Sequence, residues 1–84
     1  MTMNRQEFLT DLGLQAQTLD FYLERRWLIS DGGAFTDRDV ARTRLIGDLK
    51  MDFGVNDEGV DVILHLVDQL YGMRRALELL RGNV

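Results

Sequence analysis

The fold follows from residues 56–82, which read NDEGVDVILHLVDQLYGMRRALELLRG. Asn56 belongs to the residue types that cap helices, and Asp57 and Glu58 behind it suit the positive end of a helix dipole. Apolar residues then recur every three or four positions, and no Pro interrupts them. The pattern predicts one long helix over residues 56–82.

This helix carries two apolar seams. The first consists of Val60, Ile63, Val67, Leu70 and Leu77, and Arg74 interrupts it. The second consists of Val62, Leu66, Gln69, Met73, Ala76 and Leu80. Because the seams are offset by two positions, about 200° around a helix, they lie on nearly opposite sides. We expect the first seam to pack on the rest of the chain and the second to pair with another copy as a coiled coil, giving a homodimer. The alternative is that one seam folds back under the same chain.

Length and composition restrict the classes of protein. The chain has 84 residues, 45% of them hydrophobic, and no Cys, which fits a single small domain that gains from a second subunit. Fourteen acids against ten bases give a net charge of −4, which repels a nucleic-acid backbone. No apolar run approaches the roughly 18 residues that span a membrane, and the N-terminus lacks the layout of a signal peptide. We expect a soluble cytoplasmic protein.

Three shorter helices are expected upstream. The first runs from about Asn4 to Leu12 and stops at Gly13, the second runs from about Gln15 to Arg26, and the third runs from about Asp37 to Gly54. The buried face of the third would contain Ala41, Leu45, Ile46, Leu49 and Phe53.

Between the second and third helices the chain looks extended. Trp27-Leu28-Ile29 is a short bulky run, and Asp31-Gly32-Gly33 has the composition of a turn that leads into Ala34-Phe35. We expect a small β-hairpin, or wing, there. Phe21, Tyr22, Trp27 and Phe35 are predicted to fill the core rather than to form a ligand-binding aromatic box.

This order of elements resembles the MerR-type winged helix-turn-helix proteins. The residues that match are Leu12-Gly13-Leu14, Thr18-Leu19-Asp20-Phe21-Tyr22, Trp27-Leu28-Ile29 and Phe35-Thr36-Asp37-Arg38-Asp39-Val40. A closer resemblance, carried by residues 52–64 (DFGVNDEGVDVIL), is to the CbpM-type chaperone modulators, a MerR-like branch. The resemblance implies an all-α fold with a short β wing: one domain over residues 1–84, with the helix-turn-helix, wing and third helix in 1–55 and a dimerisation helix in 56–82.

The resemblance also implies a function. Members of the CbpM group are non-enzymatic and bind the J-domain of a DnaJ-like co-chaperone, which blocks its encounter with Hsp70. The J-domain has a positively charged helix, so the expected binding residues are the acids Asp48, Asp52, Asp57, Glu58 and Asp61. The competing interpretation is that the acids of the final helix only complement its dipole.

The alternative function is DNA binding as a MerR-family transcriptional regulator. The candidate patch consists of Arg25, Arg26, Arg38, Arg42 and Arg44. Against it, Asp20 stands where typical regulators have Arg, and the wing tip Asp31-Gly32-Gly33-Ala34 has no Lys or Arg. Pairing of these arginines with nearby acids is the favoured interpretation, so nucleic acid is not expected as a partner.

Catalytic and metal-binding chemistry is sparse. Ser30 and His65 are the only Ser and His, and there is no thiol, so no enzyme activity is expected. Asp61 and Asp68 flank His65 in the predicted helix, but a zinc site needs three or four ligands with N and S preferred. We therefore expect neither a metal nor a cofactor.

Overall fold

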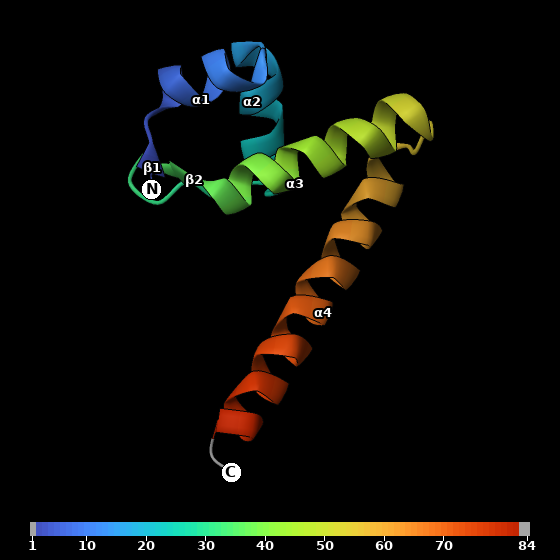
Figure 1. Cartoon of the computed structure of the whole chain (residues 1–84). Helices are drawn as coiled ribbons and strands as arrows, with labels where there is room; N and C mark the ends of the chain where they lie inside the picture. Colours follow the sequence, from blue (N-terminus) through green and yellow to red (C-terminus); the bar gives the residue numbers. More distant parts are fainter. Residues whose placement is uncertain (1, 83–84) are drawn as a thin grey trace. The chain divides into compact units, whose positions relative to one another are not determined.

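The computed structural model describes residues 2–82 and is mostly helical, with a small two-stranded sheet (Figure 1). The elements in chain order are β1 (Thr2–Met3), α1 (Arg5–Leu12), α2 (Ala16–Glu24), β2 (Phe35–Thr36), α3 (Asp37–Gly47), the π-helix η1 (Asp48–Asp52) and α4 (Asp57–Gly82). The chain divides into two compact units, Met1–Gly54 and Val55–Val84.

Local signals define α1. Asn4 caps its start: the Asn4 side chain accepts a hydrogen bond from the Glu7 amide (2.8 Å), and the Glu7 carboxylate accepts one from the Asn4 amide (3.0 Å). This reciprocal pair satisfies two amides that the helix itself leaves open. Gly13, with φ of 61°, ends the helix in the left-handed conformation that glycine adopts without strain, as predicted.

The second helix ends earlier than predicted. α2 stops at Glu24, two residues before the expected end at Arg26. Arg26 has φ of 61°, and its amide donates to the carbonyl of Leu23 (3.1 Å), so the helical ladder closes there. Gly or Asn ordinarily occupies a left-handed position at a helix end. An arginine at that position gives no sequence signal that the helix stops there.

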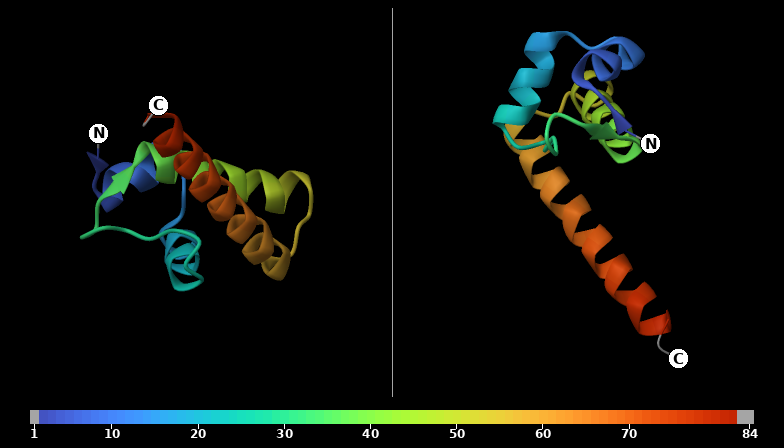
Figure 2. Two further views of the ribbon diagram at one scale, coloured as in Figure 1. Left: turned by 90° about the horizontal axis from the view of Figure 1, so that it is seen from below. Right: turned by 90° about the vertical axis from the view of Figure 1, so that its left-hand side faces the viewer.

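The strand that precedes α3 has a different partner from the one predicted. β2 pairs antiparallel with β1, with Thr2 opposite Thr36 and Met3 opposite Phe35 (Figure 2). The expected hairpin, in which Trp27-Leu28-Ile29 would pair with Ala34-Phe35, is absent from residues 2–82. Only an isolated bridge between Asp31 and Ala34 marks the predicted turn.

Trp27 and Leu28 do not form a strand because their amides have another partner. Both donate to the carbonyl of Tyr22, at 2.9 Å and 3.4 Å, which holds them against the end of α2. Their side chains are buried. Burial of two large apolar residues outweighs the preference of this bulky run for extended structure.

The third helix begins as predicted and ends differently. The amide of Thr36 donates to the Asp39 carboxylate (2.8 Å), which closes the capping box at its start. The predicted helical segment reaches Asp52 only because α3 continues into η1, a π-helical turn. Within the predicted buried face Ile46 is buried and Leu45 and Leu49 are half-buried. Ala41 and Phe53 are exposed, which contradicts the prediction.

The core of the first unit contains two aromatic groups. Phe8 of α1 stacks on Phe35 of β2, with ring centroids 4.3 Å apart. Trp27 lies edge-on to Phe21 at 5.4 Å and also contacts Tyr22 at 5.4 Å. The buried hydrophobic residues of this unit are Phe8, Leu19, Tyr22, Trp27, Leu28, Phe35 and Ile46. The predicted core role is confirmed for Tyr22, Trp27 and Phe35, whereas Phe21 is half-buried.

The long helix α4 forms almost as predicted. Its first turn is capped by Asn56, whose side chain accepts from the Gly59 amide (2.7 Å). Its buried residues are Val60 and Leu64, the latter belonging to neither predicted seam. Leu70 and Leu77, expected to be covered by the rest of the chain, are exposed. In residues 2–82 no helix combines the length and apolar character needed to cross a membrane.

We predict that Phe8→Ala lowers the free energy of unfolding by about 3–5 kcal/mol, because it removes a buried ring and its stacking partner's contact. Phe53→Ala is the matched control and should change stability by less than about 0.5 kcal/mol, since Phe53 is exposed. Urea unfolding followed by the fluorescence of Trp27, the only Trp, measures both. Equal losses for the two variants would contradict this assignment of the core.

Candidate protein-binding surfaces

An exposed apolar stripe follows α4. It consists of Leu66, Leu70, Met73, Leu77 and Leu80, all of which are exposed. These residues are spaced alternately by four and three positions, so they lie within about 80° of the helix circumference. With half-buried Ile63 they complete an unbroken heptad pattern of the coiled-coil type. We call these five residues the α4 stripe.

The α4 stripe differs from the seam predicted for dimerisation. Leu66, Met73 and Leu80 belong to both, and Val62 is exposed beside them. Gln69 and Ala76, also exposed, border the stripe, while Leu70 and Leu77 belong to it. The seam that the sequence predicted for dimerisation is therefore rotated around the helix axis, by a fraction of a turn, relative to the α4 stripe.

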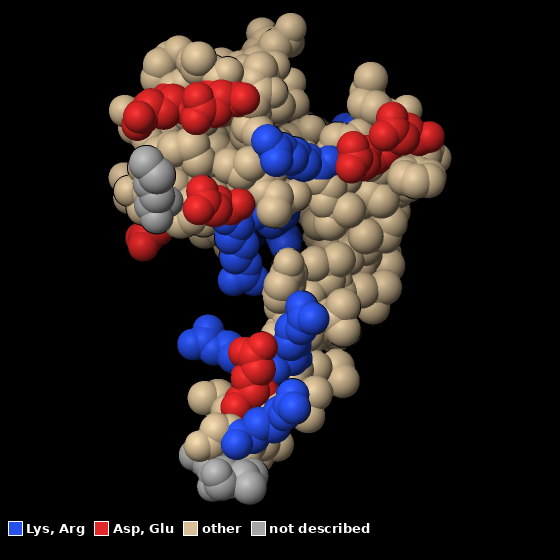
Figure 3. All heavy atoms as spheres, viewed as in Figure 1, with Lys and Arg blue, Asp and Glu red and all other residues tan. Residues whose placement is uncertain are grey.

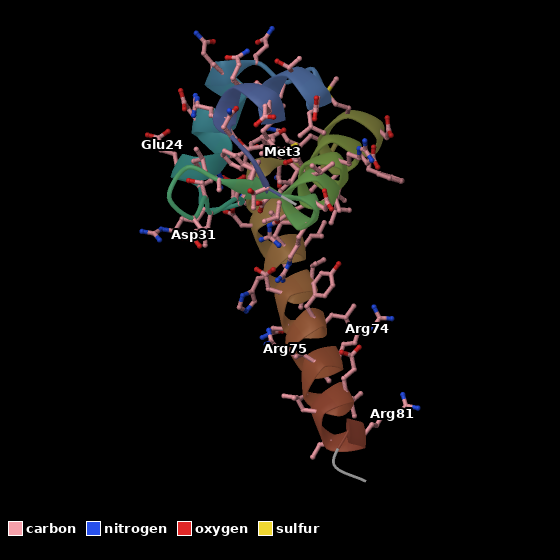
Figure 4. All side chains as sticks on the ribbon, turned by 60° about the vertical axis from the view of Figure 1, so that its left-hand side comes forward. Met3, Glu24, Asp31, Arg74, Arg75 and Arg81 are labelled. Carbon is pink, nitrogen blue, oxygen red and sulfur yellow. The ribbon has the colours of Figure 1, made fainter. Side chains whose placement is uncertain are left out.

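Charge changes sign along α4. Residues 57–70 contain the four acids Asp57, Glu58, Asp61 and Asp68 and no Lys or Arg. Residues 71–82 contain Arg74, Arg75 and Arg81 against the single acid Glu78. Basic side chains gather around one acidic side chain near the end of α4 in Figure 3, and Figure 4 shows Arg74 and Arg81 on one side of the helix. This order complements the helix dipole.

The predicted partner-binding acids belong to two elements. Asp48 and Asp52 lie in η1, about one π-helical turn apart, and both are exposed. The others lie in the first turns of α4, where Glu58 and Asp61 are exposed and Asp57 is half-buried. Each pair of exposed acids thus lies on its own element.

The predicted arginine patch is partly used within the chain. The guanidinium of Arg25 lies 5.7 Å from the centre of the Phe21 ring and 5.3 Å from that of Trp27, within cation–π range. Arg42 donates a hydrogen bond from Nε to the carbonyl of Trp27. Arg26, Arg38 and Arg44 are exposed. Arg25 and Arg42 therefore contribute to the structure of the first unit.

Asp20 pairs with a residue that sequence reasoning did not single out. Its carboxylate accepts from Nη2 of Arg5 in α1 at 2.7 Å, and both side chains are exposed. Arg5 and Asp20 are far apart in sequence, so only the packing of α1 beside α2 brings them together. An exposed pair of this kind contributes at most about 1 kcal/mol to stability.

Two further exposed residues were not identified as candidates for binding. Met51 and Phe53 lie at the end of η1 and are 84% and 75% exposed. Lys50, between the acids of η1, places its ammonium 5.2 Å from the Phe21 ring centre and 5.4 Å from that of Trp27. Helical periodicity had assigned Phe53 to the core, so the sequence contained no signal for this surface.

Among residues 2–82 no group of three or more His, Cys, Asp and Glu side chains could hold a metal ion. Comparison with family models, curated proteins and solved structures finds no match to this chain. The described surface carries an apolar stripe on one helix, and acids beside apolar side chains on η1.

We predict that Arg42→Ala lowers the free energy of unfolding by about 1–3 kcal/mol, because it removes a charged donor from the carbonyl of Trp27. Arg44→Ala, on the same helix with the same loss of charge, should cost less than about 0.5 kcal/mol because Arg44 is exposed. Urea unfolding distinguishes them. If the two variants proved equally stable, Arg42 would have no structural role.

Proposed function

We propose that the protein is a non-enzymatic modulator that binds the J-domain of a DnaJ-like co-chaperone and inhibits its action on Hsp70. The observation that carries the proposal is that each of two elements exposes a pair of acids: Asp48 and Asp52 on η1, and Glu58 and Asp61 in the first turns of α4. The resemblance of residues 52–64 to the CbpM-type modulators supplies the identity of the partner.

Inhibition would follow from occupancy alone. A J-domain presents a positively charged helix, and acids complementary to it accelerate encounter and fix its orientation. A modulator bound to that helix denies it to Hsp70, so no catalytic group is required. The net charge of −4 favours the approach of such a basic partner over the whole surface.

The alternative, a DNA-binding regulator, has less support. Arg25 and Arg42 make contacts inside the first unit, and Asp20, where MerR regulators have an arginine, is a carboxylate paired with Arg5. A carboxylate there would repel a phosphate. Retention of DNA instead of a J-domain protein would favour this alternative.

We predict that Glu58→Lys combined with Asp61→Lys weakens binding to the J-domain of the co-chaperone from the same organism by about tenfold or more, because attraction becomes repulsion. The matched control is Asp11→Lys with Asp31→Lys, two exposed acids elsewhere whose reversal changes the net charge equally. Isothermal titration calorimetry measures the affinity, and J-domain-stimulated ATP hydrolysis by Hsp70 measures inhibition. Wild-type protein that neither binds the J-domain nor reduces stimulation would contradict the proposed function.

We further propose that the protein is a homodimer held by the α4 stripe. Five exposed large apolar residues in one row form a surface that monomeric proteins rarely leave open. In an antiparallel pair the row is complementary to itself, with Leu66 opposite Leu77 of the second copy and Leu70 opposite its Met73. This arrangement also runs the acidic segment of each helix, before residue 71, alongside the more basic segment of the other, which favours it over a parallel pair.

We predict that Leu66→Glu with Met73→Glu halves the mass in solution, because buried carboxylates would disrupt the paired stripe. Leu79→Glu is the matched control: Leu79 is 65% exposed on the same helix but lies about half a turn from the stripe. Multi-angle light scattering gives the mass, and circular dichroism should show unchanged helix content. A monomeric wild type would exclude the dimer.

A further inference from the structure

The end of η1 exposes two large apolar side chains. Of the exposed large hydrophobic residues in the described chain, Met51 at 84% and Phe53 at 75% are the most exposed. They are two positions apart, so their side chains leave different sides of this short segment of the first unit, and Asp52 lies between them in the chain. We call Met51 and Phe53, together with the adjacent acids Asp48 and Asp52, the η1 tip.

The backbone holds this surface in place. The amide of Phe53 donates to the carbonyl of Asp48 at 3.2 Å, the five-residue hydrogen bond that defines a π turn. Gly54 follows with φ of 64°, a left-handed position that lets the chain leave the helix directly after Phe53. The exposure of Phe53 is thus the product of a formed turn and not of a frayed helix end. Such π turns are frequent at functional sites.

Charge at the η1 tip is one-sided. Lys50 is the only base in η1, and its ammonium is directed to the rings of Phe21 and Trp27. Asp48 and Asp52, separated by about one π-helical turn, share the other side of η1. Within residues 2–82 the carboxylates of these two acids make no hydrogen bond or ion pair. Two uncompensated negative charges therefore lie on the same exposed segment as the two apolar side chains.

We propose that the η1 tip is a docking surface for a basic, amphipathic segment of a partner protein. Met51 and Phe53 would be its apolar anchors, and Asp48 and Asp52 would pair with Lys or Arg at the edge of the contact. Large apolar side chains dominate interface energetics, and methionine adapts its shape to the partner. Charge complementarity fixes the occupant, because a partner must bring both apolar surface and positive charge.

Other occupants fit the η1 tip less well. A second copy would bring Asp48 and Asp52 against their own counterparts, which is repulsive. The anionic surface of a bilayer would repel the same carboxylates. The identity of the basic partner as a J-domain rests on the proposed function, whereas the surface itself does not.

The first test compares J-domain binding by calorimetry for the wild type and for the double variant Met51→Ser with Phe53→Ser. We expect the affinity to fall by about tenfold or more, as it does when anchor residues are truncated. Ile29→Ser is the matched control, because Ile29 is 72% exposed in the same unit, and it should stay within about twofold. Because all three residues are exposed, thermal unfolding of the variants should match the wild type.

The outcomes separate the two proposals. Wild-type binding that the double variant retains would overturn the apolar anchors and leave the proposed function intact. If the wild type does not bind the J-domain, the proposed function fails. The docking surface is then tested by placing a photo-crosslinking residue at position 53, or at position 29 as the control, in living cells. A crosslink to a basic protein at position 53 alone, abolished by Asp48→Lys with Asp52→Lys, supports the η1 tip. No protein adduct, or one with a second copy, overturns it.

Discussion

Trp27 joins three of the helical elements of the first unit. Its amide donates to the carbonyl of Tyr22 in α2 (2.9 Å), and its carbonyl accepts from Arg42 in α3. Its ring lies 5.3 Å from the guanidinium of Arg25 and 5.4 Å from the ammonium of Lys50 in η1. One residue therefore joins α2, α3 and η1 through backbone hydrogen bonds, packing and cation–π contacts. The position of Lys50 follows from this arrangement, since the rings that attract its ammonium are buried or half-buried at fixed places.

The second unit, in contrast to the first, buries few of its residues. α4 has 26 residues, but its buried residues are Val60 and Leu64, and every residue from 68 to 82 is exposed. Helices without tertiary packing are marginal in water, and Gly72 costs this segment about 1 kcal/mol relative to Ala. Good helix formers and the acidic-to-basic order of charge offset part of that cost. An apolar row on such a helix favours a covered state, in which burial of the row would stabilise both helix and assembly.

The sequence predicts what local interactions determine. Asn4, Gly13, Thr36 and Asn56 mark helix ends because a cap depends on residues within one turn, and each acts at the expected end. The pairing of β2 with β1 joins segments that are distant in sequence. The N-terminal strand β1 is too short to show the alternating pattern from which a strand is predicted. The exposure of Phe53 was missed for a related reason: a π turn changes the number of residues per turn, so a periodicity of 3.6 assigns the wrong side of the helix.

The two exposed apolar surfaces have different chemistry, and this difference is the reason that we propose different partners for them. The α4 stripe is apolar along its whole length, so two copies can pack together without burying a charge. The η1 tip sets Met51 and Phe53 beside Asp48 and Asp52, and two copies of it would meet with like charges. The two acids thus oppose self-association through Met51 and Phe53. The same acids attract a basic surface. A chain with both features can form a dimer through one surface and keep the other open for a different protein.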